Sequence, residues 1–115
     1  MTPEAIRDLV NNTLEDRKAR DVVTLAVADI TDITDFMIIA TGTSSRHVKA
    51  LVDNVVTEVK SAGMRARGIE GRESHEWVLV DLGDVLVHVM QADTREFYDL
   101  ERLWSDFSTD TETGV

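Results

Sequence analysis

Hydrophobic positions along this chain recur with two spacings, which predict alternating helices and strands. Near the start of the chain, apolar residues lie three or four positions apart, which is typical of a helix with one buried face. These residues are Ile6, Leu9, Val10 and Leu14. Thr2 and Pro3 offer a hydroxyl cap and a first helical residue that needs no donor. We therefore expect a helix from Thr2 to about Ala19.

The next segment changes to an alternating pattern. From Val22 to Ala28 both sides of the chain are largely apolar, which predicts a strand covered on both faces. The Asp29 to Asp35 segment has the composition of a turn, and the apolar run from Phe36 to Ala40 predicts a central strand. Because the connection is short, we expect these two strands to pair antiparallel.

A wide apolar stripe predicts a second helix that packs on the sheet. Its residues are Val48, Leu51, Val52, Val55, Val56 and Val59. Gly42 ends the preceding strand, Thr43 to Ser45 offer caps, and Gly63 ends the helix. A strand is expected from about Met64 to Ile69. The strand, helix, strand order favours a right-handed crossover with a parallel pair, so the sheet must be mixed.

The last third of the chain predicts a hairpin and a helix. Trp77 to Val80 and Val85 to Met90 form two short strands around the turn residues Asp81 to Asp84. Asp93 or Thr94 would cap the final helix. Phe97, Leu100 and Trp104 of that helix share a face. We assign Phe97 and Trp104 to the core.

These elements predict an α/β (α+β) fold, a mixed five-stranded sheet flanked by helices in a single domain. The chain has 115 residues, of which 43% are hydrophobic, enough for one core of moderate size. Two domains would each be too small. We expect the domain to span residues 1–107 and residues 108–115 to be a disordered acidic tail, because the last residues lack apolar periodicity.

Composition favours a cytoplasmic protein. The chain contains no cysteine, which excludes disulfides and thiolate metal sites and fits a reducing compartment. Met1 to Leu9 mix acidic and basic residues, so no signal peptide is visible, and the apolar stretches are too short to span a membrane.

The net charge of -10 is distributed unevenly along the chain. Residues 1–68 hold ten acids and nine bases, whereas residues 69–115 hold twelve acids and three bases. An acidic half repels phosphate backbones, which argues against base-specific nucleic-acid recognition, and attracts a basic protein partner. For any single acid, a role in solubility alone is an equally good interpretation.

One segment suggests a nucleotide site. The Gly42 to Ser45 turn joins a strand to a helix start, where free amides and the helix dipole can hold an anion. It lacks the glycines and lysine of a phosphate-binding loop, and the Met64 to Ile69 strand carries no carboxylate pair for magnesium. Asp81 and Asp84 are better explained as residues that fix their turn. A nucleotidyltransferase-like enzyme using the Gly42 to Ser45 turn is therefore the alternative, and an ordinary capped turn is preferred.

The sequence indicates neither a metal centre nor a cofactor. His47, His75 and His88 lie far apart without the short spacing of a zinc site. Ser44 or Ser45 with His47 is too close in sequence for a catalytic triad, so a capping serine is preferred.

Three side chains are candidate anchors for a partner. His88 alternates with the apolar residues of its strand, which makes it either a half-buried, hydrogen-bonded histidine or part of a sheet face that meets a partner. Trp77 and Tyr98 suit binding or core packing equally well, because both bury a large area and keep a polar group.

Several segments, in order, resemble the ribosomal silencing factor (Iojap-like) family. The first is DITDFMIIATGTSSRH from Asp32 to His47, followed by Glu70 and Gly71 and by WVLVDLGDVLVHVM from Trp77 to Met90. The last matching residues are Arg95, Phe97, Tyr98, Leu100, Glu101, Leu103 and Trp104. The resemblance extends from the first helix to Ser105.

The resemblance implies a nucleotidyltransferase-like topology without the catalytic carboxylates and without enzymatic activity. It further implies binding to the fourteenth protein of the large ribosomal subunit, a basic protein. The bound factor obstructs joining of the small subunit and slows translation under nutrient limitation. The implied partner surface comprises Glu70, Trp77, Asp81, His88, Met90, Arg95, Tyr98 and Glu101. Members are often described as homodimers, although nothing in this sequence identifies a self-interface.

Overall fold

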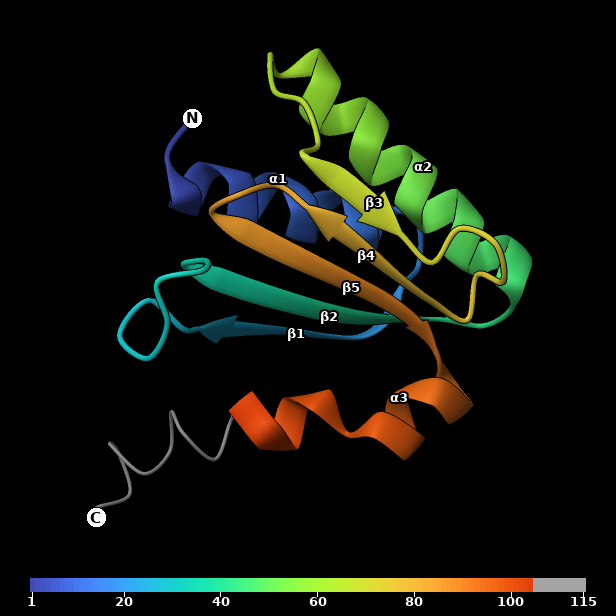
Figure 1. Ribbon diagram of the computed structural model, residues 1–115. Coiled ribbons are helices and arrows are strands. Elements are labelled where there is room, and N and C mark those ends of the chain that lie inside the picture. The colour runs from blue at the N-terminus through green and yellow to red at the C-terminus, as the bar shows by residue number, and fades with distance from the viewer. Residues whose placement is uncertain (105–115) are drawn as a thin grey trace.

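The computed structural model describes residues 1–104 and shows a five-stranded sheet with helices on both of its faces (Figure 1). The elements in chain order are α1 (Pro3–Asp16), β1 (Arg20–Ala26), β2 (Phe36–Gly42), α2 (Ser45–Ser61), β3 (Gly68–Glu70), β4 (Trp77–Asp81), β5 (Val85–Gln91) and α3 (Ala92–Tyr98). Residues 100–104 are helical as well. The expected domain end at residue 107 and the expected tail lie outside the described residues.

The first helix begins as the sequence predicts and ends earlier. The Thr2 hydroxyl accepts a hydrogen bond from the Ala5 amide at 3.0 Å, and Pro3 follows in the first turn. The helix ends at Asp16 because Lys18 adopts a left-handed conformation with φ 64°, which lets the Ala19 amide close the last turn onto the Leu14 carbonyl. Among the described residues, no helix has the length and apolarity needed to cross a membrane.

The sheet has the strand order β1-β2-β5-β4-β3 and is mixed, as predicted. β1 pairs antiparallel with β2, and the β4–β5 hairpin is present. The predicted neighbouring pair of β2 and β3 is wrong, because the parallel partner of β2 is β5. Val85, Val87 and Val89 alternate along β5 and are fully buried, which suits the centre of a sheet, whereas the three-residue β3 pairs only with β4, at the edge.

The larger core lies between the sheet and the helices α1 and α2, which cover the same face (Figure 1). Alternate residues of the central strands point into it, and the helices supply the apolar stripes that the sequence predicts. Its fully buried members include Val10, Leu14, Ile38, Val48, Leu51, Val55, Val78, Val80, Val87 and Val89.

A smaller cluster lies on the opposite face of the sheet, which we call the open face. Met37, Ile39 and Met90 are buried there, with Leu100 and Trp104 packed against them. The helix α3 lies on this face and contacts β5 and β2. The open face is thus covered by helix over β2 and β5, while a cavity remains over β3 and β4.

Two predictions about the last helix are wrong. Its cap is Gln91, without a side-chain cap bond, because β5 runs directly into α3 and leaves no loop for Asp93 or Thr94 to cap. Phe97 is 80% exposed instead of buried. Asp99, with φ 45°, interrupts the helix between Tyr98 and Leu100, so Phe97 does not share a face with the residues that follow.

Candidate functional site

Aromatic rings form a continuous row on the open face. The ring centroids of Trp77 on β4 and Tyr98 on α3 are 4.9 Å apart, and Phe97 meets Tyr98 edge-on at 5.0 Å. His88 on β5 lies at the other end, 5.9 Å from Trp77. We call these four residues the aromatic row. Tyr98 is 56% exposed and Phe97 80%, so the row offers the large, amphipathic side chains that are favoured in protein interfaces.

His88 holds the indole of Trp77 in place. The Trp77 Nε1 donates a hydrogen bond to His88 Nδ1 at 2.9 Å, so Nδ1 carries no proton and Nε2 does. The imidazole is only 6% exposed, and its Nε2 has no partner among the described residues. Burial lowers the pKa of His88 from 6.5 to about 4, so the ring is neutral at pH 7. The hydrogen-bonded interpretation of His88 is confirmed, and its burial is deeper than expected.

An open cavity of about 280 Å³ lies beside the aromatic row. It is lined by Glu70, Gly71, Trp77, Leu79 and His88. Glu70 is paired with Leu79 across β3 and β4, which places both side chains on the open face. Gly71 has φ 91°, and a Cβ at this position would overlap the carbonyl oxygen of Trp77. The backbone after β3 therefore passes directly against Trp77, and this close approach fixes one wall of the cavity.

Asp81 and Met90 have structural roles in this arrangement. The Asp81 Oδ1 accepts a hydrogen bond from the Gly83 amide at 2.8 Å, which confirms that this aspartate fixes the hairpin turn. Met90 is fully buried under the open face, so it supports the surface from below.

Arg95 and Glu101 form an ion pair. The Arg95 Nε donates to Glu101 Oε1 at 2.6 Å, and its Nη1 donates to the Thr41 hydroxyl at 2.7 Å. The Arg95 side chain is only 11% exposed. These bonds tie α3 and the segment after it to the end of β2, and they lie apart from the cavity residues.

The structure thus brings together five of the eight residues that the sequence suggested, namely Glu70, Trp77, His88, Met90 and Tyr98. Sequence reasoning missed three neighbours of this group. Phe97 was assigned to the core, and Gly71 entered only as part of the family resemblance. Leu79 could have been found, because it alternates with the buried Val78 and Val80 and must share the face of Trp77.

The Gly42 to Ser45 turn uses its polar groups internally. The Ser44 hydroxyl accepts from the His47 amide at 3.1 Å, and the His47 Nδ1 accepts from the Thr43 amide at 2.9 Å. The His47 Nε2 donates to the Arg17 carbonyl at 2.9 Å. The capping role of Ser44 is confirmed. The Thr43 amide of the turn and the His47 amide in the first turn of α2 are already bonded within the protein, which disfavours the anion interpretation.

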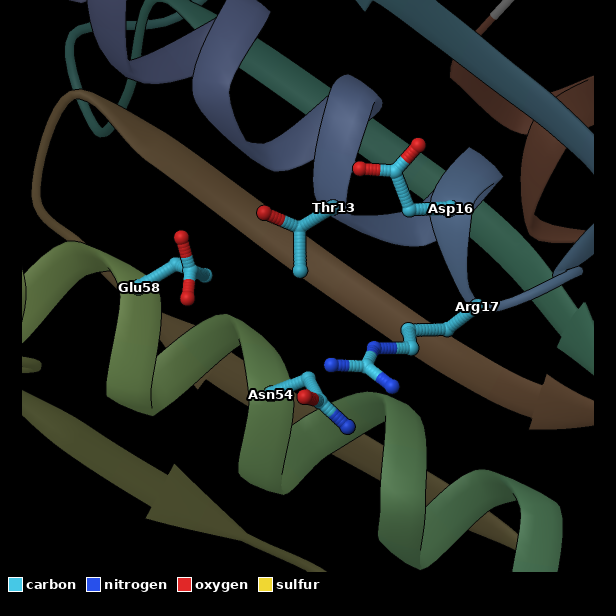
Figure 2. A pocket seen from close by; sticks show the side chains of 5 residues that line it. All are labelled: Thr13, Asp16, Arg17, Asn54 and Glu58. Carbon is cyan, nitrogen blue, oxygen red and sulfur yellow. The ribbon is translucent and has the colours of Figure 1, made fainter.

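A polar groove lies between α1 and α2, on the other side of the sheet (Figure 2). Its volume is about 170 Å³, and it is lined by Thr13, Asp16, Arg17, Asn54 and Glu58. Thr13 and Asn54 each donate a hydrogen bond to a carbonyl of their own helix. We assign no ligand to this groove. Within residues 1–104, no group of three or more histidine or acidic side chains is placed to hold a metal ion.

Comparisons with known proteins agree on one family. The model of the family described as "Ribosomal silencing factor during starvation" matches residues 2–114. A Haemophilus influenzae protein named "Ribosomal silencing factor RsfS" is 48% identical over 101 residues, which are 88% of this chain and 99% of the relative. A mouse protein named "Mitochondrial assembly of ribosomal large subunit protein 1" is 35% identical over 91% of this chain and 47% of its own length.

Solved structures show the same fold. A crystal structure of a Chromobacterium violaceum protein superposes with a TM-score of 0.89 at 47% identity, covering 91% of this chain and 88% of that one. A Bacillus halodurans crystal structure has a TM-score of 0.80 at 38% identity, covering 88% and 94%. The predicted α/β (α+β) class, one domain around a mixed five-stranded sheet, is confirmed.

Proposed function

The chain belongs to the ribosomal silencing factor family, and from this premise we propose that it is a ribosome-associated regulator of translation. It binds the large ribosomal subunit through the subunit's fourteenth protein and blocks joining of the small subunit. Translation then slows under nutrient limitation. The protein acts in the cytoplasm by occupying a surface, so it needs no catalytic group and no cofactor.

One observation carries this proposal, the row of aromatic side chains next to a cavity that contains the Glu70 carboxylate. Tyr98 and Phe97 are large side chains left in solvent, and large exposed apolar groups beside charged ones are typical of interaction surfaces. The acids of the second half of the chain, Glu70 among them, complement the lysines and arginines of a ribosomal protein. The partner surface therefore comprises Trp77, Phe97, Tyr98 and Glu70, with the buried His88 holding Trp77 through its hydrogen bond.

Steric exclusion requires only binding, which this surface can provide. Blocking a subunit interface requires only that the bound protein overlaps the volume that the small subunit would occupy. A small domain can do so through a modest interface, provided that a few anchors supply most of the affinity.

The direct test is sedimentation with purified ribosomal subunits. We expect the protein to comigrate with the large subunit and not with the small one. Light scattering should show that it slows association of the two subunits. Comigration with neither subunit, or unchanged association, would overturn the proposal.

Tyr98→Ala tests the surface itself. The ring is 56% exposed, so its removal should leave the fold largely unchanged while weakening large-subunit binding by roughly tenfold or more. Ile33→Ala is the matched control, because Ile33 is 72% exposed in the loop between β1 and β2, outside the aromatic row. Trp77→Ala is a less direct test, since it also removes the donor to the buried His88. Equal losses from Tyr98→Ala and Ile33→Ala would show that the aromatic row is not the contact surface.

A further inference from the structure

We propose that the cavity lined by Glu70, Trp77 and Leu79 is a socket for one cationic side chain, an arginine, of the partner protein. The inference rests on the proposed function for the source of that arginine, because it takes the partner to be a basic protein. The inference adds that the partner surface must carry an arginine that projects toward this protein. An arginine projecting from the partner surface enters the socket beside the aromatic row.

The walls of the socket suit the shape of an arginine. Trp77 and Leu79 form an apolar surface that can cover the methylene groups of a long side chain. A guanidinium is planar and weakly hydrated, and it stacks on an indole face, whereas an ammonium is compact and strongly hydrated. The volume of about 280 Å³ is open on one side, as an inserted side chain requires.

The charge of the socket has no ion-pair partner in the part of the chain that the structure describes. Glu70 is exposed, and its carboxylate takes part in none of the hydrogen bonds or ion pairs found within residues 1–104. The nearest base in sequence, Arg72, is directed to Asp53 at 3.8 Å. Glu73 and Glu76 follow on the same loop and add to the negative potential. A partner cation can therefore pair with Glu70 without displacing an internal one.

The floor of the socket does not oppose a cation. His88 is uncharged at neutral pH, because burial holds its pKa well below 7. Its Nδ1 is occupied by the Trp77 indole, which keeps the indole plane fixed as a stacking surface. The cavity therefore combines an apolar wall and a neutral floor with a carboxylate.

The loop that frames the socket is already ordered by hydrogen bonds. The His75 amide donates to the Gly71 carbonyl at 3.2 Å, and the Gln91 amide donates to the Glu76 carbonyl at 2.9 Å. The Gln91 side chain also donates to the His75 carbonyl at 3.1 Å. A preformed site loses little conformational entropy when it is filled, which favours binding of a single side chain.

An NMR titration tests the socket without a ribosome. The probes are N-acetyl-arginine amide and the N-acetyl amide of citrulline, which has nearly the same shape and no charge. We expect the arginine compound to shift the Trp77 indole resonance in a saturable way, with the Trp104 indole as internal reference. Glu70→Gln should abolish the shift, and Glu73→Gln should preserve it, because Glu73 lies on the loop that follows β3 and does not line the cavity. Equal shifts from both probes, or an unaffected Glu70→Gln variant, would overturn the inference.

The same variants separate this inference from the proposed function. In large-subunit binding, we expect Glu70→Gln to lower affinity about tenfold and Glu73→Gln to lower it less than about twofold. If Tyr98→Ala weakens binding and Glu70→Gln does not, the socket is wrong and the proposed function stands. If the wild-type protein ignores the subunit, the proposed function fails, and the arginine titration still decides whether the socket binds a cation.

Discussion

His88 lies under the proposed partner surface, yet its ring determines how Trp77 is presented. The unprotonated Nδ1 accepts the indole N–H, and this bond requires the neutral imidazole. Protonation would place two donors face to face and leave a charge in a buried site. The protonation state of the buried His88 therefore controls the position of Trp77, a half-buried anchor.

Acid should destabilise the protein through His88. The pKa of this histidine is 6.5 in the unfolded chain and about 4 in the folded protein, so the unfolded state binds more protons between these values. The contribution to stability is complete above pH 6.5 and is lost as the pH falls to 4, a change on the order of 3 kcal/mol. We expect urea unfolding at pH 7.5 and 4.5 to show a smaller pH dependence for His88→Gln than for the wild type. Identical pH dependence would contradict this assignment.

At the residue scale, periodicity predicted which side chains share a face, and it failed where the backbone departs from regular geometry. Alternation placed His88 on one side of its strand correctly. Phe97 was assigned to the core by helical spacing. The left-handed residue Asp99 interrupts the helix, so Phe97 does not lie on the same face as Leu100 and Trp104. A pattern that assumes continuous helix cannot anticipate such a residue. The pairing of His88 with Trp77 also depends on the hairpin register, which the spacing alone left open.

The helix α3 is the element that completes the open face, and Arg95 holds it there. This side chain bonds to Thr41 at the end of β2 and to Glu101 in the segment after the helix. Because both bonds involve a charged group that is 11% exposed, each should contribute more than a surface ion pair does. The position of Tyr98 next to Trp77 follows from this attachment.

Arg95→Met should loosen α3 without unfolding the rest of the sheet. The variant leaves the Thr41 hydroxyl and the Glu101 carboxylate without their donor. We expect hydrogen exchange of residues 92–104 to accelerate by about tenfold or more, since a hydrogen bond to a charged group contributes about 1.5–3 kcal/mol. Arg102→Met is the control, because Arg102 is an exposed arginine of the same segment. Similar exchange in both variants would show that Arg95 does not hold the helix.

At the element scale, most helices and strands could be predicted, while their order in the sheet could not. The stripe of α2 and the hairpin of β4 and β5 are clear in the sequence. The expected neighbour of β2 was β3, because a crossover helix joins them and local connections are the usual choice. In the structure β5 pairs with β2 instead, because the buried valines of β5 suit the centre of the sheet, and the short β3 lies at the edge.

For the molecule as a whole, the two faces of the sheet have different roles. Helices α1 and α2 close one side of the sheet (Figure 1). The aromatic row and its socket occupy the other side. The net charge of -10 acts over distances longer than any contact, so it should draw the protein toward a basic surface before docking.

Association with the isolated basic partner protein should therefore depend on salt. We expect the association rate constant to fall by about tenfold or more between 50 and 500 mM salt, because screening shortens the range of the attraction. The dissociation rate should change less, since the aromatic contacts are not screened. Biolayer interferometry with immobilised protein measures both rates. Association rates that do not vary with salt would show that long-range attraction plays no part.

The two borders of the sheet also limit how copies of this protein can meet. β3 offers only three residues, and β1 has an irregular register between Arg20 and Val23, where Asp21 adopts φ 49°. Neither border presents a long, flat row of free amides and carbonyls, which growing fibrils use as a template. Two copies would therefore join through their side chains rather than by extending one sheet into the next, and the protein should stay resistant to polymerisation when it accumulates.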